Sequence, residues 1–260
     1  MNVGHAARRV VQAVRAFDNG WSLLASIGAR RHGDLEFRQG DTVISCPNVP
    51  GARVPVFEVF AEDAYRNGWF SAGLTNPKVL DIGGHIGCFT VDICRVVPGA
   101  TVHAYEASPT TAAYLERNVA RNVPDGRATV FNEALSSANG TLKLIDNAGA
   151  SGLNSINGAS TGGTTVEVPA VSFRTALDRL GGTVDVVKMD IEGGEYAVLA
   201  GSDPAEWAPA QRVVMEYHDV EGHDFAEVEK FFDTAGLKVV RHEPVTDRLG
   251  VVWFSRDPLD

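Results

Sequence analysis

The sequence has few cysteines, and their spacing excludes most cysteine chemistry. Its 260 residues include only Cys46, Cys88 and Cys94. No two of them have the CxxC spacing of a zinc or redox motif, and three scattered cysteines do not suggest a disulfide framework. We therefore predict three buried free thiols, the usual state of an unpaired cysteine.

Long apolar runs and an excess of positive charge are also missing. No apolar stretch approaches the roughly 20 residues of a membrane span. The arginine-containing start of the chain lacks the apolar region and cleavage site of a signal peptide. The formal net charge is -10, which disfavours nucleic acid as substrate because phosphate binding depends on clustered lysine and arginine. We expect a cytoplasmic protein with no membrane or nucleic-acid partner.

The remaining pattern divides the chain into two parts. Residues 1–75 mix helical spacing with a polar segment, in which we expect a strand at 41–46 and a helix at 55–67, and we interpret this part as a cap. From Pro77 onward, apolar strands alternate with amphipathic helical segments, which is typical of a parallel α/β sheet. Strands are expected at 78–82, 101–105, 128–132, 185–189 and 212–217.

Two further segments complete the predicted domain. Residues 146–165 are rich in Gly, Ser, Asn and Thr, which predicts a mobile loop or hairpin tip and a candidate lid. A helix is expected at 225–235. The two β-rich segments after it, 237–242 and 250–255, are expected to form an antiparallel pair at one end of the sheet.

The first strand of the predicted sheet runs into a glycine-rich turn, DIGGHIG, at residues 81–87. Such a turn brings backbone N–H groups close to a ligand, so we interpret it as a cofactor loop. His85 replaces the middle glycine of the dinucleotide fingerprint, and the Gly-Lys-Ser/Thr of a phosphate-binding loop is absent. An acidic residue at the mouth would repel phosphate but suits a methionine moiety that carries ammonium and sulfonium charges. The candidate cofactor residues of this turn are Asp81, Gly83, Gly84, His85 and Gly87.

Polar residues at the ends of the next two strands extend the predicted cofactor site. Glu106, followed by Ala107, ends the second strand, where a carboxylate would accept hydrogen bonds from both ribose hydroxyls. The third strand ends in Asn132, Glu133 and Ala134, where an amide or a carboxylate could contact an adenine edge. These residues, together with Asp190 after the fourth strand, complete the candidate cofactor set.

Two polar pairs follow the fourth and fifth strands, at the edge where open α/β sheets bind ligands. Lys188 and Asp190 share a face of the fourth strand, and Glu216 and His218 share a face of the fifth. The alternative is a structural one, in which Lys188 forms internal salt bridges with Glu216 or Asp190. We favour a reaction site, because burying charge at the centre of a sheet is costly.

The segment KMDIEGGE at residues 188–195, together with DIGGHIG and the later Glu216-Tyr217-His218, resembles the FkbM family of methyltransferases. The resemblance implies S-adenosylmethionine (SAM) as cofactor and a Rossmann-like class I methyltransferase fold, with a seven-stranded, mostly parallel sheet whose last strand is antiparallel. It implies a SAM-binding domain at 76–260, an N-terminal segment that helps to shape the acceptor pocket, and mostly O-methylation in natural-product or glycan pathways. Gly84 departs from the alanine that is common in the family.

The resemblance also implies roles for individual residues: Gly83, Gly87 and Glu106 around the cofactor, and Asp190, Glu216 and His218 around the acceptor. Our hypothesis is that His218 accepts the proton of an acceptor hydroxyl, because imidazole titrates near neutral pH, and that Glu216 or Asp190 orients it. In a second version, Asp190, Glu216 and His218 hold a divalent cation that acidifies the hydroxyl. No metal is expected in the first version.

Other functions fit the sequence less well. A nicotinamide-dependent dehydrogenase would need the glycine that His85 replaces, and a non-catalytic SAM-binding protein would not need both polar pairs. The lack of an Asn-Pro-Pro-Tyr-like motif further disfavours nucleic-acid methylation. Among small-molecule acceptors, a carboxylate, nitrogen or carbon atom remains an alternative to a hydroxyl. The acceptor and the oligomeric state, with a homodimer as one option, stay open.

Overall fold

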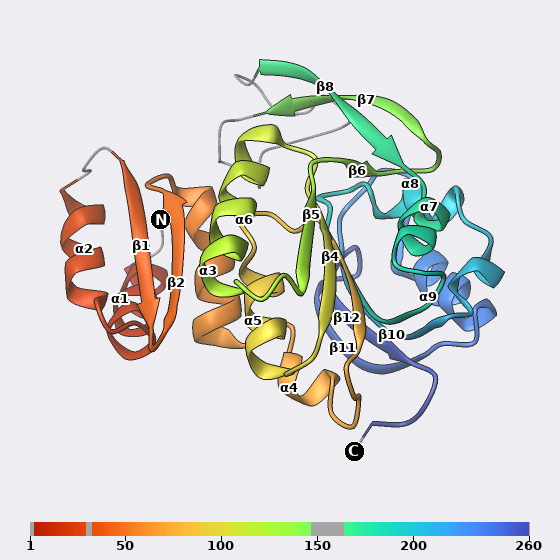
Figure 1. Cartoon of the computed structure of the whole chain (residues 1–260), viewed down its shortest axis with the longest axis horizontal. Helices are drawn as coiled ribbons and strands as arrows, with labels where there is room; N and C mark the ends of the chain where they lie inside the picture. The colour runs from red at the N-terminus through yellow and green to blue at the C-terminus, as the bar shows by residue number, and fades with distance from the viewer. Residues whose placement is uncertain (1–2, 30–32, 147–163, 260) are drawn as a thin grey trace.

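A seven-stranded mixed sheet forms the centre of the computed structural model, which describes residues 3–29, 33–146 and 164–259. The strand order is β11-β12-β10-β9-β3-β4-β5 (Figure 1). Strand β12 runs antiparallel to both of its neighbours, and the other pairs are parallel. The last strand is thus antiparallel, as the resemblance implies. The strands are β3 (Lys78–Ile82), β4 (Thr101–Tyr105), β5 (Ala128–Phe131), β9 (Val184–Met189), β10 (Ala210–Tyr217), β11 (Lys238–Thr246) and β12 (Leu249–Ser255).

The central strands match the predicted ranges closely because they are apolar on both faces. Parallel strands covered by helices on both sides read as continuous apolar runs, which makes them easy to find in a sequence. In β3 and β9 the buried exceptions are Asp81 and Lys188. The antiparallel pair predicted at the end of the sheet is also confirmed, as β11 with β12.

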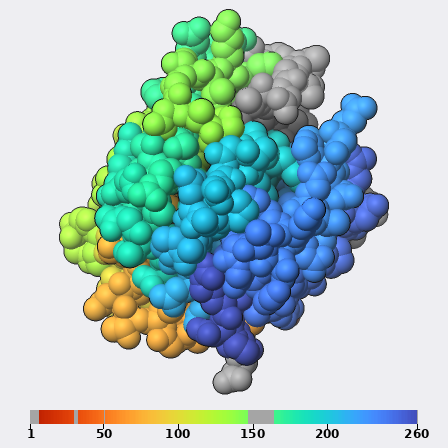
Figure 2. Space-filling model, turned by 90° about the vertical axis from the view of Figure 1, so that its right-hand side faces the viewer, coloured from red at the N-terminus to blue at the C-terminus, as the bar shows by residue number. Residues whose placement is uncertain are grey.

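Helices cover both faces of the sheet and enclose two separate hydrophobic cores. On one face lie α5 (Cys88–Val96) and α6 (Pro109–Asn122), together with the N-terminal segment. On the other lie α7 (Phe173–Arg179), α8 (Glu195–Ala200) and α9 (Phe225–Thr234). Figure 2 views the molecule from this second face, which the later part of the chain covers. The result is the three-layer α/β architecture expected of a Rossmann-like fold.

The N-terminal segment packs against α6 through a β-hairpin. Its elements are α1 (Val3–Ala16), α2 (Gly20–Gly28), β1 (Asp34–Gln39), β2 (Thr42–Pro47), α3 (Pro50–Glu62) and α4 (Asn67–Phe70). Asn118 and Asn122 of α6 accept hydrogen bonds from the backbone N–H groups of Ser45 and Val43 in β2, at 2.8 and 2.9 Å. Strand β2 confirms the strand expected at 41–46, whereas β1 is an element that we did not expect.

The helix predicted at 55–67 is wrong in position. Helix α3 begins at Pro50, because a proline suits the first helical position, where its missing N–H is not needed. It ends at Glu62, because the next residue, Asp63, adopts a left-handed conformation with φ of 51°. Pro55 resembles a helix start in the sequence but lies inside the helix.

A second, three-stranded sheet, in the order β6-β8-β7, adjoins the carboxyl edge of the main sheet. Its strands are β6 (Ala134–Leu135), β7 (Gly140–Asp146) and β8 (Thr164–Val171), and Asp146 pairs with Thr164 at the end of the β7–β8 ladder. The predicted loop at 146–165 therefore continues from two paired strands, but its residues 147–163, and with them the candidate lid, lie outside the described residues.

The cysteine prediction is confirmed, since all three thiols are free and buried. Burial raises the pKa of Cys46 to about 12 and that of Cys94 to about 11. Such thiols stay protonated and unreactive near neutral pH. Within the ranges that the structure describes, no helix has both the length and the apolar character to cross a bilayer.

Candidate active site

A cleft of about 400 Å³ lies where β3, β4, β9 and β10 end, at the carboxyl edge of the sheet. This volume is within the usual range of small-molecule sites. The cofactor turn and the ends of β4, β9 and β10 form one part of its wall. Helix α3 and the segment after it form another, with Val54, Pro55, Glu58 and Tyr65 among the lining residues. The cleft is thus bounded by both the sheet and the N-terminal segment.

The glycine-rich turn is held tightly between β4 and the end of β9. Gly83 and Gly84 both donate their N–H to the carbonyl of Tyr105, at 2.9 and 2.8 Å. Gly83 has φ of +81°, and a Cβ atom there would lie 1.8 Å from the carbonyl oxygen of Asp190. The first motif therefore touches the second through backbone atoms, and only glycine permits this approach.

We expect Gly83→Ala to lower the free energy of unfolding by about 2–5 kcal/mol, because the left-handed backbone and the overlap with Asp190 both carry a cost. The matched control is Gly84→Ala, whose new Cβ would lie 3.0 Å from the flexible Leu115 side chain. That change should cost less than about 1.5 kcal/mol. Denaturant unfolding of both variants measures the difference, and equal losses would contradict the role assigned to Gly83.

The Glu106 carboxylate is fixed at the end of β4, facing the cleft. One oxygen accepts the N–H of His85 and the other accepts the N–H of Ser108, both at 2.9 Å. Burial raises the pKa of Glu106 to about 7, although these two hydrogen bonds favour the charged form. Each oxygen still has a lone pair for a ligand hydroxyl. The glycine turn and this anchored carboxylate together fit a cofactor that carries a ribose.

Asp81 does not lie at the mouth of the cleft, contrary to our expectation. Its side chain is fully buried; it accepts the hydroxyl of Thr90 at 2.6 Å and lies 3.3 Å from Nζ of Lys188. Asp81 therefore neutralises a buried lysine, and its contact with a methionine ammonium stays a prediction. Burial alone would lower the pKa of Lys188, but the charges of Asp81 and Asp190 raise it above its ordinary value.

Lys188 lines the cleft, yet its ammonium is largely engaged by the protein. It donates to the carbonyl of Gly83 at 2.5 Å and lies 4.0 Å from an oxygen of Asp190. The internal salt-bridge alternative is therefore partly realised, with Asp81 as the nearer partner in place of Glu216. Lys188 thus links the two motifs, and a direct catalytic role for it stays a prediction.

The remaining predicted cofactor residues divide into two groups. Gly84, His85, Ala107, Glu133 and Ala134 line the cleft, as do Gly83, Glu106 and Asp190. Gly87 and Asn132 do not: Gly87 precedes α5 with φ of +91°, and the Asn132 amide donates to the carbonyls of Glu106 and Ala107 at 2.8 and 3.1 Å. These two residues therefore lie behind the residues that line the cofactor side of the cleft.

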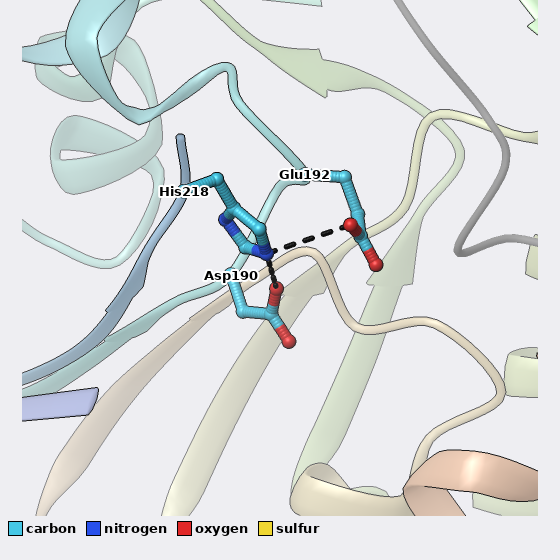
Figure 3. Close-up of side chains that lie close together, drawn as sticks. All are labelled: Asp190, Glu192 and His218. Atoms are coloured by element: carbon cyan, nitrogen blue, oxygen red, sulfur yellow. Dashed lines mark ion pairs between the residues drawn. The ribbon is translucent and has the colours of Figure 1, made fainter. Parts of the chain in front are cut away.

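His218, at the end of β10, lies at the centre of a group of carboxylates (Figure 3). Its Nε2 is 3.4 Å from Glu192, 3.8 Å from Glu216 and 4.0 Å from Asp190. Its Nδ1 is 3.0 Å from Oε1 of Glu195, which is fully buried. The partner of Nδ1 is thus Glu195, not the expected Glu216 or Asp190, whose carboxylates face the other ring nitrogen.

This arrangement favours a charged imidazole. Burial opposes the charge, but the hydrogen bond to Glu195 and the nearby carboxylates outweigh it and raise the pKa of His218 to about 10. Burial, with the Asp190 charge added, also raises the pKa of Glu216 to about 8 and that of Glu58 to about 7. From its residue type alone, His218 is predicted to titrate near neutral pH. The negative charges around it raise its pKa.

Reasoning from the sequence missed several residues of this site, among them four polar ones in the neighbourhood of Asp190 and His218. Glu192 and Glu195 are part of the segment that carries the family resemblance, so the motif was a signal that could have included them. Glu58 lines the cleft from α3, and Tyr65 donates its hydroxyl to Asp190 at 3.0 Å. No sequence pattern indicates Glu58 or Tyr65, because their positions depend on how the N-terminal segment packs on the sheet.

The fold and the cleft define the class of protein. The structure of magnesium protoporphyrin IX methyltransferase from Synechocystis PCC 6803 with bound SAM superimposes with a TM-score of 0.50 over 96% of this chain and 97% of that chain, at 14% identity. A likeness at this identity shows the fold alone, which is that of the class I SAM-dependent methyltransferases. The model of the Methyltransferase FkbM domain family matches residues 81–239. The chain belongs to this family and is a SAM-dependent methyltransferase.

Curated relatives agree with this assignment. Methyltransferase 1 of Beauveria bassiana is 30% identical over 72% of this chain and 81% of its own length. Methyltransferase sdnD of Sordaria araneosa is 26% identical over 64% and 76%. The 31-O-demethyl-FK506 methyltransferase FkbM of Streptomyces tacrolimicus is 29% identical over 55% of this chain and 66% of its own length. Family membership leaves no support for the dehydrogenase alternative.

Proposed function

We propose that this methyltransferase transfers the methyl group of SAM to a hydroxyl oxygen of a small molecule, with His218 as the proton acceptor. The observation that carries the proposal is the position of His218, which lines the same cleft as the cofactor turn and has Nε2 among carboxylates. The name of the Streptomyces relative, a 31-O-demethyl-FK506 methyltransferase, is in keeping with an oxygen acceptor on a natural product.

The proposal assigns residues 76–260 to SAM binding and residues 1–75 to one wall of the acceptor pocket. Methyl transfer is an in-line displacement, so positioning supplies much of the rate, up to roughly 7–11 kcal/mol. The glycine turn and Glu106 would hold the cofactor on the sheet side. Val54, Glu58 and Tyr65 line the cleft from the N-terminal side and would face the acceptor.

His218 must be neutral before it can accept a proton. Its pKa of about 10 means that the free protein holds it as imidazolium near neutral pH. When bound, SAM supplies an activated methyl group and a positive charge. His218 then loses its proton more readily, because added positive charge in the cleft offsets the surrounding carboxylates. Neutral Nε2 can accept the acceptor proton, a step that contributes about 10²–10⁴-fold.

A second mode of action has a specific observation in its favour. One ligand atom each from Asp190, Glu192 and His218 lies within 4.8 Å of the others (Figure 3). This group could hold a divalent cation that acidifies an acceptor hydroxyl. It differs from the ligand set expected from the sequence in that Glu192 takes the place of Glu216, which lies next to the group.

Chelation separates the two modes. If His218 acts alone, we expect turnover to change by less than about twofold after dialysis against excess EDTA, because no step needs a metal. Formation of S-adenosylhomocysteine from SAM, measured with an acceptor found in a screen of hydroxylated small molecules, provides the assay. A loss of more than tenfold that Mg²⁺ or Mn²⁺ restores would overturn the metal-free mode and support the cation.

A further inference from the structure

Glu195 is a buried carboxylate whose position is set by the turn before α8. It is fully buried, and its Oε1 accepts the backbone N–H groups of Ile191 and Gly193 at 3.0 and 3.3 Å. Glu192 and Gly193 adopt left-handed conformations, with φ of 52° and 95°, which turn the chain back over this oxygen. The backbone therefore fixes the carboxylate before any contact with another side chain is considered.

The same oxygen lies 3.0 Å from Nδ1 of His218. Because Oε1 already accepts two N–H groups, it acts as the acceptor here also, and Nδ1–H is the donor. The contact thus sets the direction of the imidazole ring. Nδ1 faces the protein interior, and Nε2 faces the carboxylates of Asp190, Glu192 and Glu216.

We propose that Glu195 is a positioning residue, which holds Nδ1–H of His218 and so keeps Nε2 directed into the cleft. Glu195 is not among the residues that line the cleft, whereas His218 is. It therefore acts through His218 and does not touch the acceptor or the cofactor. This assignment rests on the proposed function for its effect on turnover, but the hydrogen bond itself can be tested without any acceptor.

A similar histidine–glutamate contact elsewhere in the chain is exposed to solvent. His223, which lies just before α9, and Glu227 of α9 form a pair through Nδ1, at 2.9 Å, with side chains 39% and 52% exposed. A pair in water contributes little and exchanges its proton rapidly. The His218 side chain is only 16% exposed and that of Glu195 is 0% exposed. The exposed pair is therefore a matched control for the buried one.

Proton NMR in water tests the hydrogen bond directly. We expect a far-downfield Nδ1–H resonance that disappears in His218→Asn, because a buried N–H held by a carboxylate exchanges slowly and forms a strong hydrogen bond. Glu195→Ala should abolish the resonance, and Glu195→Gln should retain it at a smaller downfield shift, because an amide oxygen is a weaker acceptor. Glu227→Ala should leave the resonance unchanged.

Kinetics supply the second measurement. Glu195→Ala should lower kcat by about 10–100-fold, a part of the about 10²–10⁴-fold that a base contributes, with KM for SAM changed by less than about threefold. Glu195→Gln should recover most of the loss. The proposal is overturned if Glu195→Ala keeps the resonance, or if, where that variant does not fold, Glu195→Gln leaves its shift unchanged. If the resonance behaves as expected but His218→Ala keeps full turnover, the positioning contact stands and the base role of the proposed function fails.

Discussion

Replacing His218 with alanine is expected to lower kcat by about 10²–10⁴-fold, the contribution of a positioned base to proton transfer. The change removes the ring whose Nε2 faces the cleft and leaves the glycine turn and Glu106 untouched. KM for SAM should therefore change by less than about threefold, which is the pattern of an interaction made in the transition state. Steady-state kinetics with a hydroxylated acceptor measure both parameters.

Two further variants are needed to interpret the result for His218→Ala. Glu216 also lines the cleft and has a raised pKa, about 8, so it too could exchange a proton near neutral pH. We expect Glu216→Gln to reduce kcat less than His218→Ala does; the reverse order would transfer the base role to Glu216. Nearly full turnover in both variants would exclude a base and favour a carboxylate acceptor, which needs none. His218→Asn, which keeps a polar side chain, controls for lost stability.

Glu106→Ala is expected to weaken binding of S-adenosylhomocysteine by at least about 100-fold. A hydrogen bond to a charged group contributes about 1.5–3 kcal/mol, and a ribose offers two hydroxyls to this carboxylate. The substitution also removes the acceptor of the N–H groups of His85 and Ser108, which shape the cofactor turn. Isothermal titration calorimetry of the purified protein measures the loss directly.

The size of this loss depends on Glu106 itself and not on the overall charge. Glu106→Gln should lose less than the alanine variant, because an amide oxygen still accepts one of these hydrogen bonds. Glu167→Ala, an exposed site on β8 away from the cleft, should bind as the unchanged protein does. Binding by Glu106→Ala within about threefold of the unchanged protein would remove Glu106 from the cofactor site, and binding of NAD in its place would be at odds with the family assignment.

Much of the fold follows from local pattern. The strands β3, β4, β9 and β10 are apolar runs followed by polar or glycine-rich ends, and such runs can only be stable inside a covered parallel sheet. The elements missed are strands that are weakly apolar themselves or whose partners are distant in the sequence. Strand β1, with the sequence DLEFRQ, is weakly apolar although it pairs with the adjacent β2, and β7 pairs with β8 across the segment 147–163. Neither kind of strand is readily predicted from its own residues.

By itself, the sequence determined the cofactor turn, the two polar strand ends and the family, because each depends on residues that are adjacent along the chain. The tertiary structure decided which charges meet. It buried Asp81 against Lys188, brought Tyr65 to Asp190 and placed Glu195 against Nδ1 of His218. Side-chain pairing and pKa values depend on distances between separate elements and on the water excluded around them, and neither quantity can be read from one strand at a time.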